Sequence, residues 1–293
     1  MIKYFMLHAR NPAIGQRDLI EYYEDRFVRS VADLLPFIRQ HRRHYVSSDR
    51  SPALVAAELP FTDPGFDMIA EFVLANGADA RRMAKAMTQP GIGSALGLEN
   101  SAVFNTRNGM AFAAQASATP PEHLARRPDA HAGPPAVQTF VLIRRNPALC
   151  RDQFVAHYEN RHTSIVLTHL VRGGLPLFAR YVRNFPVDAN GSLPIGQFGV
   201  VPAPYDCFGE VAYWTEDDAR QFAPIMSRAD VADVFEADGK IMLDGGCYHQ
   251  IQVETREDCL TLSAPGTRLS ITDDFRAPTQ LDCLQYGEKF PSG

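Results

Sequence analysis

Residues 10–27 read RNPAIGQRDLIEYYEDRF, and residues 145–162 read RNPALCRDQFVAHYENRH, at a constant offset of 135 residues. Seven of these eighteen positions are identical, and four others are Ile/Leu, Leu/Phe, Ile/Val and Asp/Asn exchanges. Two later matches follow in the same order: HYV at 44–46 returns as RYV at 180–182, and FDMIAEFV at 66–73 returns as YDCFGEVA at 205–212. Three matches in one order predict an internal duplication.

Each copy predicts the order strand, helix, strand, strand, helix, strand. In the second copy, residues 139–145 are rich in β-branched and aromatic residues and stop at an Asn-Pro pair, which indicates a strand. A helix is expected over 150–172, because Phe154, Tyr158 and His162 recur every four residues. Further strands are expected at 178–185, 205–214 and 241–253, with a second helix beginning at Glu216. This order is that of the ferredoxin-like fold, in which two helices cover one face of an antiparallel sheet.

The duplication predicts an α+β protein made of two fused ferredoxin-like (βαββαβ) domains. The helices cover only one face of each sheet, so the other apolar face must be buried against another element. The sheet of the other copy can bury it, so the two antiparallel sheets should pack as an intramolecular dimeric α/β barrel. Residues 115–137 are rich in Ala and Pro, and the last residues show no clear period. The expected parts are a first domain at 1–112, a linker at 113–137, a second domain at 138–255 and a tail at 256–293.

The composition predicts an ordinary globular protein. The 293 residues are 45% hydrophobic and 22% charged with a net charge of -5, which leaves no basic surface for nucleic acid. No run approaches the roughly 20 apolar residues of a membrane helix, and the start resembles a strand more than a secretory signal. We therefore expect a cytoplasmic protein without nucleic-acid or membrane partners. The five cysteines are odd in number and never form CxxC, which argues against disulfides and thiolate zinc sites.

His162 is the leading candidate for chemistry. It shares the apolar stripe of its helix with Phe154 and Tyr158, whereas the first copy carries Phe27 at this position. Burying an imidazole without partners costs about 1–3 kcal/mol, so a partner or a cavity is expected beside it. Histidine can give or take a proton near neutral pH, which suits a general acid or base. A core histidine satisfied by a carbonyl or a carboxylate is the alternative.

Other polar residues of the second copy are candidates to assist His162. Tyr158 is one turn earlier and could donate its phenol, although Tyr23 repeats it in the first copy. Asp206 and Glu210 share one face of a strand and could orient the imidazole, or they could instead pair with arginines. The candidate substrate-binding residues are Glu210, Asn184, Tyr181, His169, Trp214 and Arg144. His157 is five residues from His162 and is expected on a different face, so no metal site and no cofactor are predicted.

The second copy resembles an EthD domain of the dimeric α/β-barrel superfamily. The resemblance rests on FVLIRRNPALCRDQFVAHYENRHTSIV at 140–166, on Tyr181 and Asn184 of a YxxN strand, and on YDCFGEVAYW at 205–214. The first copy is similar over about 2–110, but it has Phe27 in place of the motif histidine and Ser47 where Asn184 stands. The resemblance implies a ferredoxin-like barrel and a small, hydrophobic, often aromatic ligand. Related barrels include monooxygenases, cyclases, dehydratases and haem proteins, so the fold does not fix the reaction.

The leading functional hypothesis is a cofactor-independent lyase or isomerase of dehydratase type. His162 would act by general acid/base catalysis on a small, largely apolar, aromatic compound. A cofactor-free or haem-dependent monooxygenase and a non-catalytic ligand-binding protein are the alternatives. Association into a further homodimer also stays open.

Overall fold

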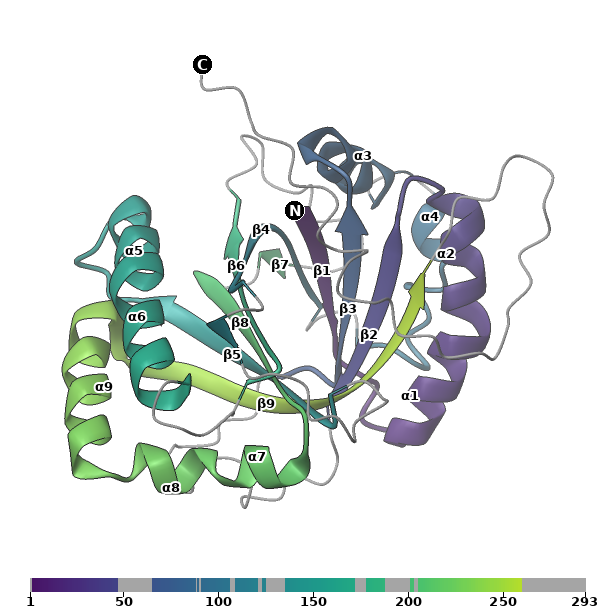
Figure 1. Ribbon diagram of the computed structural model, residues 1–293. Coiled ribbons are helices and arrows are strands. Elements are labelled where there is room, and N and C mark those ends of the chain that lie inside the picture. The colour runs from purple at the N-terminus through teal and green to yellow at the C-terminus, as the bar shows by residue number, and fades with distance from the viewer. Residues whose placement is uncertain are drawn as a thin grey trace.

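The duplication is visible in the order of the elements (Figure 1). This computed structural model describes residues 2–46, 65–87, 89, 91–105, 109–120, 123–124, 135–171, 178–187, 201–202 and 205–259. The first copy consists of β1 (Ile2–His8), α1 (Gln16–Tyr22), η1 (Tyr23–Phe27), α2 (Val28–Leu34), β2 (Gln40–Val46), β3 (Met68–Leu74), α3 (Gly77–Met87), α4 (Ile92–Ala95) and β4 (Met110–Ala118). The second consists of β5 (Val137–Arg145), α5 (Arg151–His157), η3 (Tyr158–His162), α6 (Thr163–Val166), η4 (Leu167–Val171), β6 (Arg180–Pro186), β7 (Val201–Pro202), β8 (Cys207–Tyr213), α7 (Glu216–Arg220), α8 (Phe222–Met226), α9 (Ala229–Met242) and β9 (Leu243–Cys259).

One closed sheet joins the two copies. Within the described residues the strand order is β1-β3-β2-β9-β5-β8-β6-β4-β7, and a further pairing of β1 with β4 closes a barrel of all these strands except β7. The strand β4 pairs with β1 at one end and with β6 at the other, and β9 likewise joins β5 to β2. The barrel fold is thus confirmed, but its halves are hydrogen-bonded edge to edge rather than stacked as two layers. Because the sheet closes, each of the eight strands in the barrel pairs with a neighbour on both sides.

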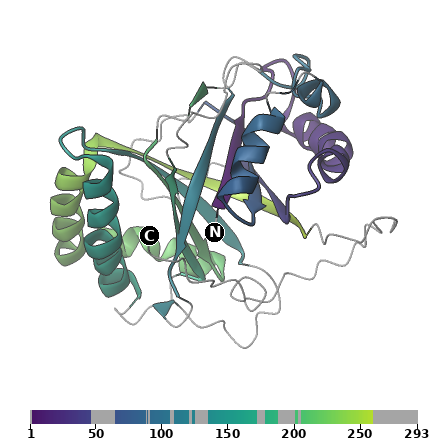
Figure 2. The ribbon, with the colours of Figure 1, turned by 90° about the horizontal axis from the view of Figure 1, so that it is seen from above.

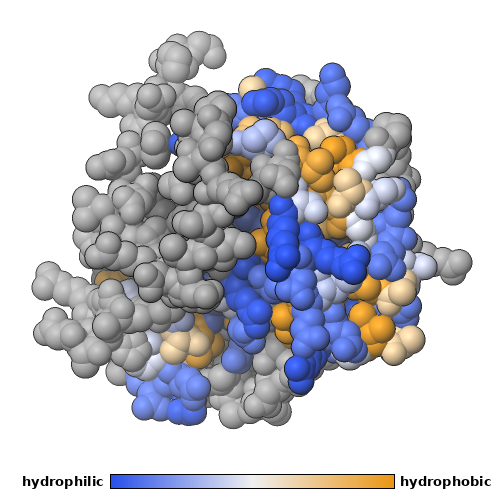
Figure 3. Space-filling view, turned by 90° about the vertical axis from the view of Figure 1, so that its right-hand side faces the viewer, coloured by the Kyte–Doolittle hydropathy of each residue, from blue (hydrophilic) through white to orange (hydrophobic). Residues whose placement is uncertain are grey.

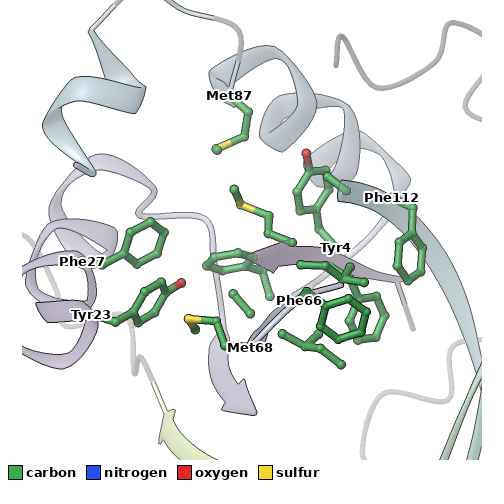
Figure 4. Close-up of a cluster of buried hydrophobic side chains, with 14 of the residues drawn as sticks. Tyr4, Tyr23, Phe27, Phe66, Met68, Met87 and Phe112 are labelled. Carbon is green, nitrogen blue, oxygen red and sulfur yellow. The ribbon is translucent and has the colours of Figure 1, made fainter. Parts of the chain in front are cut away.

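The helices lie outside the barrel in two groups. Figures 1 and 2 show α5, α6 and α9 together on one side and α1 to α4 on the other. Strand residues alternate between the barrel interior and the helices. Inside, the Phe5 ring lies 4.9 Å from Phe112 and 5.9 Å from Phe208, centroid to centroid, so aromatic rings of both copies meet there. Outside, Tyr23 and Phe27 point from η1 toward the sheet of the first copy (Figure 4).

The strand register corrects one of the sequence matches. Glu71 pairs across the ladder with Arg42, and its counterpart Glu210 pairs with Val182. His44 is therefore the counterpart of Asn184, and the match of HYV with RYV, like that of Ser47 with Asn184, was wrong. The reason is a longer connection before β6 than before β2, which shifts the offset between the copies.

The last strand of each copy runs beyond its expected end. β4 continues to Ala118, into the segment expected as linker, and β9 continues to Cys259. These extra residues make the seams with β6 and β2. Residues 121–122 and 125–134 of the expected linker and all of the tail after Cys259 lie outside the described residues.

The described surface is mixed in character. Figure 3 shows hydrophilic and hydrophobic residues interspersed on the face that carries α1, α2 and α4. Ile241 is the one large hydrophobic side chain that is exposed in the described part of the chain. No helix there is long and apolar enough to cross a membrane.

Candidate active site

The long helix widens into a π-turn at the same place in both copies. The amide of Thr163 donates to the carbonyl of Tyr158, five residues earlier, and Val28 donates to Tyr23 in the first copy. Such a turn brings residues five apart to one side of the helix, and it often marks a functional site. His157 and His162 therefore face the same neighbour, which corrects the expectation that they point to different faces.

That neighbour is the carboxylate of Asp238, on α9. His162 Nδ1 lies 2.8 Å from Asp238 Oδ2, and His157 Nε2 lies 2.8 Å from Asp238 Oδ1. The Asp238 side chain is only 1% exposed. Burial alone would raise the pKa of Asp238, but the hydrogen bonds from the two histidines outweigh it and leave the pKa below its usual value. The carboxylate is therefore ionised at neutral pH.

The hydrogen bond to Asp238 fixes how His162 can react. An ionised carboxylate only accepts hydrogen bonds, so Nδ1 of His162 carries the proton and Nε2 carries the lone pair. The His162 side chain is 16% exposed, and no described residue hydrogen-bonds to its Nε2. This arrangement makes Nε2 of His162 an oriented base.

Tyr158 and Tyr181 lie next to His162, on the helix-facing side of the sheet. The Tyr158 ring centroid is 4.6 Å from that of His162, and the Tyr181 hydroxyl donates to the Tyr158 hydroxyl at 3.5 Å. Burial raises the pKa of both phenols above its usual value, so both stay protonated. Phe185 contacts Tyr158 and Phe235 contacts His162, both edge-on, which makes the surroundings aromatic.

Glu210 and Asn184 lie on the other face of the sheet, inside the barrel. Asn184 Nδ2 donates to Glu210 Oε1 at 2.7 Å, and Lys3 and Arg180 also bind Glu210. Strand alternation separates them from Tyr181 on the same strand as Asn184. They form part of a buried polar network and do not reach His162.

Asp206 binds an arginine instead of His162. The backbone N–H of Arg145 donates to Asp206 Oδ2 at 3.0 Å and its Nε to Oδ1 at 2.9 Å. Asp67 makes the same two hydrogen bonds with Arg10 in the first copy. A contact present in both copies indicates a structural ion pair at the strand end.

Three further candidate residues lie away from this cluster. Arg144 stacks over the ring of Tyr205 at 5.8 Å, His169 is on η4, and Trp214 follows β8 directly. No described hydrogen bond or ring contact joins any of them to His162. The structure thus brings together only His162, Tyr158 and Tyr181 of the residues singled out in the sequence.

Two residues of the cluster escaped the sequence analysis. Asp238 lies on the buried side of α9 with Val231 and Met242, at spacings of seven and four residues, so a carboxylate on an apolar helix stripe was the available signal. His157 was hidden by the π-turn. No set of three or more His, Cys, Asp or Glu side chains in the described ranges is arranged to hold a metal ion.

The first copy carries different polar groups at the equivalent places. By position along the helix and strands, Tyr22 and Phe27 replace His157 and His162, while His8 and His41 occupy the places of Ile143 and Tyr181. The pair of imidazoles on one carboxylate is therefore a feature of the second copy.

Comparison with known proteins places both copies in one family model. The model for the EthD domain matches residues 11–106 and 146–246. No curated protein matches the chain.

Solved structures resemble this chain at low sequence identity. An anthrone oxidase-like protein is 11% identical over 92% of this chain and 96% of that one, with a TM-score of 0.50. A monooxygenase, described as putative, from Lactobacillus acidophilus NCFM is 9% identical over 87% and 92%, with a TM-score of 0.43. A chlorite dismutase from Candidatus Nitrospira defluvii is 8% identical over 86% and 91%, with a TM-score of 0.42.

Proposed function

Because this chain belongs to the EthD domain family, we propose that it is an enzyme in which His162, oriented by Asp238, moves a proton of a small, largely apolar substrate. The observation that carries the proposal is the 2.8 Å hydrogen bond from His162 Nδ1 to Asp238, which leaves the lone pair of Nε2 available. A buried carboxylate that orients an imidazole and stabilises its protonated form is a recurrent device of catalytic bases.

The reaction class that these groups serve best is a lyase or isomerase reaction. Nε2 of His162 removes a proton from a C–H bond next to a carbonyl group, and Asp238 offsets the positive charge that the imidazole gains. Tyr158 donates its phenolic hydrogen bond to the oxygen on which negative charge develops. The proton then returns from His162 to another carbon, which is isomerisation, or to a departing hydroxyl group, which is dehydration. Both reactions balance without a redox cofactor.

The aromatic surroundings favour an aromatic substrate. The rings of Tyr158 and Phe235 contact the imidazole, and Phe185 contacts Tyr158. Rings of a flat substrate gain about 0.5–1.5 kcal/mol per well-placed aromatic contact beyond the area that they bury.

A cofactor-free monooxygenase is the second candidate, because the same oriented base would form the carbanion that reacts with O2. Oxygen consumption with product formation would identify this reaction, and a Soret band in the purified protein would identify a haem-dependent one. Retention of an aromatic compound without turnover would indicate a binding protein instead.

His162→Phe tests the proposal, since it copies the residue of the first copy and should fold. The assay follows exchange of the acidic C–H bonds of 2-tetralone, an aromatic ketone, in D2O by NMR. The wild-type protein should exchange these protons faster than buffer alone does. The rate that the variant catalyses should be at least about 100-fold lower than that of the wild type. His169→Phe, on the same helix but outside the cluster, is the matched control and should stay within about twofold. Full exchange by His162→Phe would refute the proposal.

A further inference from the structure

Asp238 has two imidazole partners, and the proposed function uses only one of them. His162 binds Oδ2 and His157 binds Oδ1, each at 2.8 Å. Both histidine side chains are 16% exposed, so both can exchange protons with solvent. One buried negative charge therefore serves two groups that can each become positive.

Among the residues that the structure describes, few other charged or titratable groups lie near the carboxylate. Arg161 Nε lies 3.4 Å from Asp238 Oδ1, but its side chain is 58% exposed and solvent screens it. Tyr158 faces His162 from the same helix, and Tyr181 and Arg183 lie beneath them on β6. Arg183 is bound to Glu159, which balances its charge.

A single carboxylate can offset one imidazolium far better than two. When His157 is protonated, His162 must take its proton beside a second positive charge, as well as beside Arg161. Uptake of the two protons is then coupled, and the second requires a lower pH than the first.

We propose that His157 is a positioning residue that, through the carboxylate it shares with His162, sets the pH below which His162 stops acting as a base. This inference rests on the proposed function of His162. His157 extends the working range toward acid because its own positive charge delays proton uptake by His162.

The first copy supports a common role for the two histidines. At their positions it carries Tyr22 and Phe27, so it lacks both imidazoles. It nevertheless keeps the π-turn, and also the ion pair of Arg43 with Glu24 that repeats the one of Arg183 with Glu159. The helix geometry therefore does not require His157.

Two variants of opposite charge test the inference. In His157→Gln, the amide nitrogen can still donate to Asp238, but it never becomes charged. In His157→Lys, the ammonium group donates and stays charged. We expect the acid limb of the pH profile of 2-tetralone exchange to move to higher pH in the Gln variant and to lower pH in the Lys variant, each by about half to one pH unit.

A second measurement separates this inference from the proposed function. NMR of the His162 ring proton as a function of pH reports its proton uptake without any turnover, and thermal unfolding checks that each variant is folded. Opposite shifts of the His162 titration in the two variants support the coupling even if no exchange activity is found, in which case only the proposed function fails. An unchanged titration in both variants, or a shift in one common direction, overturns the role of His157 while leaving that of His162 intact. His169→Gln, at the far end of the same helix, is the control and should shift nothing.

Discussion

The ammonium group of Lys3, on β1 of one copy, lies 2.5 Å from the carboxylate of Glu210, on β8 of the other. It also lies 2.9 Å from Glu71, and all three side chains are almost completely buried. One cation thus separates two carboxylates in the middle of the barrel.

Lys3→Met should destabilise the protein by about 3–5 kcal/mol, because it removes the cation that lies between two buried carboxylates and leaves Glu71 with Arg42 and Glu210 with Arg180. Urea unfolding at pH 7 measures the loss. Lys240→Met, which removes an exposed lysine paired with Glu236, is the control and should cost no more than about 1 kcal/mol. A loss of that small size for Lys3→Met would contradict the assigned role.

The cost of Lys3→Met should depend on pH. Burial raises the pKa of Glu71 and of Glu210, but Lys3 is the largest opposing influence on both and the net pKa values lie below the usual range. Their contribution to stability is therefore present above the unfolded-state value of about 4.3 and is lost as the pH falls through the folded-state values. In the variant, protonation of one carboxylate relieves the repulsion, so the gap to the wild type should narrow in acid. A constant gap from pH 7 to pH 4 would argue against this account.

Asp238→Asn should lower the rate of the exchange reaction at least about 100-fold while changing the KM little. An amide cannot hold both imidazoles in their present tautomers, so the lone pair of His162 is no longer fixed on Nε2. Steady-state kinetics with 2-tetralone measures the effect. Asp233→Asn, at an exposed position of the same helix, is the matched control. Activity of Asp238→Asn within threefold of the wild type would show that the carboxylate does not orient the base.

His8→Ile should reduce the loss of unfolding free energy that the protein shows as the pH falls from 7 to 4. Burial lowers the pKa of His8 to about 4, and its Nε2 has no hydrogen-bond partner among the described residues. Between an unfolded-state value of about 6.5 and pH 4 the unfolded chain binds a proton that the folded one rejects, so the wild type loses stability as the pH falls. Ile is the residue of the second copy at this place. The stability of the variant relative to the wild type should rise by about 3 kcal/mol from pH 7 to pH 4, as measured by urea unfolding. If the unfolding free energies of the variant and the wild type differed by the same amount at every pH, this account of His8 would be wrong.

The duplication made the fold predictable, because two copies of one element order leave two bare sheet faces, and both faces are buried when the sheets close into one barrel. The helix from Cys150 onward and the pairing of His162 with Tyr158 were accessible for the same reason: apolar spacing places them on one stripe. The alignment of β2 with β6 could not be predicted from the sequence. The connection before β6 is longer than the one before β2, which changes the offset between the copies, and three-residue matches such as HYV and RYV are too short to determine that offset.

The spacing of residues along the sequence could not identify the carboxylate that binds His162. Asp206 and Glu210 were the expected partners, but Arg145 binds the former and the barrel interior holds the latter. Asp238 is 76 residues from His162, and only the packing of α9 against η3 brings the two together. The π-turn was equally hidden, since helical periodicity assumes a uniform turn.

Both copies belong to one polypeptide, and β4 and β9 join them into one barrel by pairing with strands of the other copy. This arrangement has an evolutionary consequence. In an assembly of identical subunits, any change in the gene appears twice around the ring. Here Phe27 and His162 occupy equivalent places in the same molecule, so each half can carry a different residue at the same point of its helix.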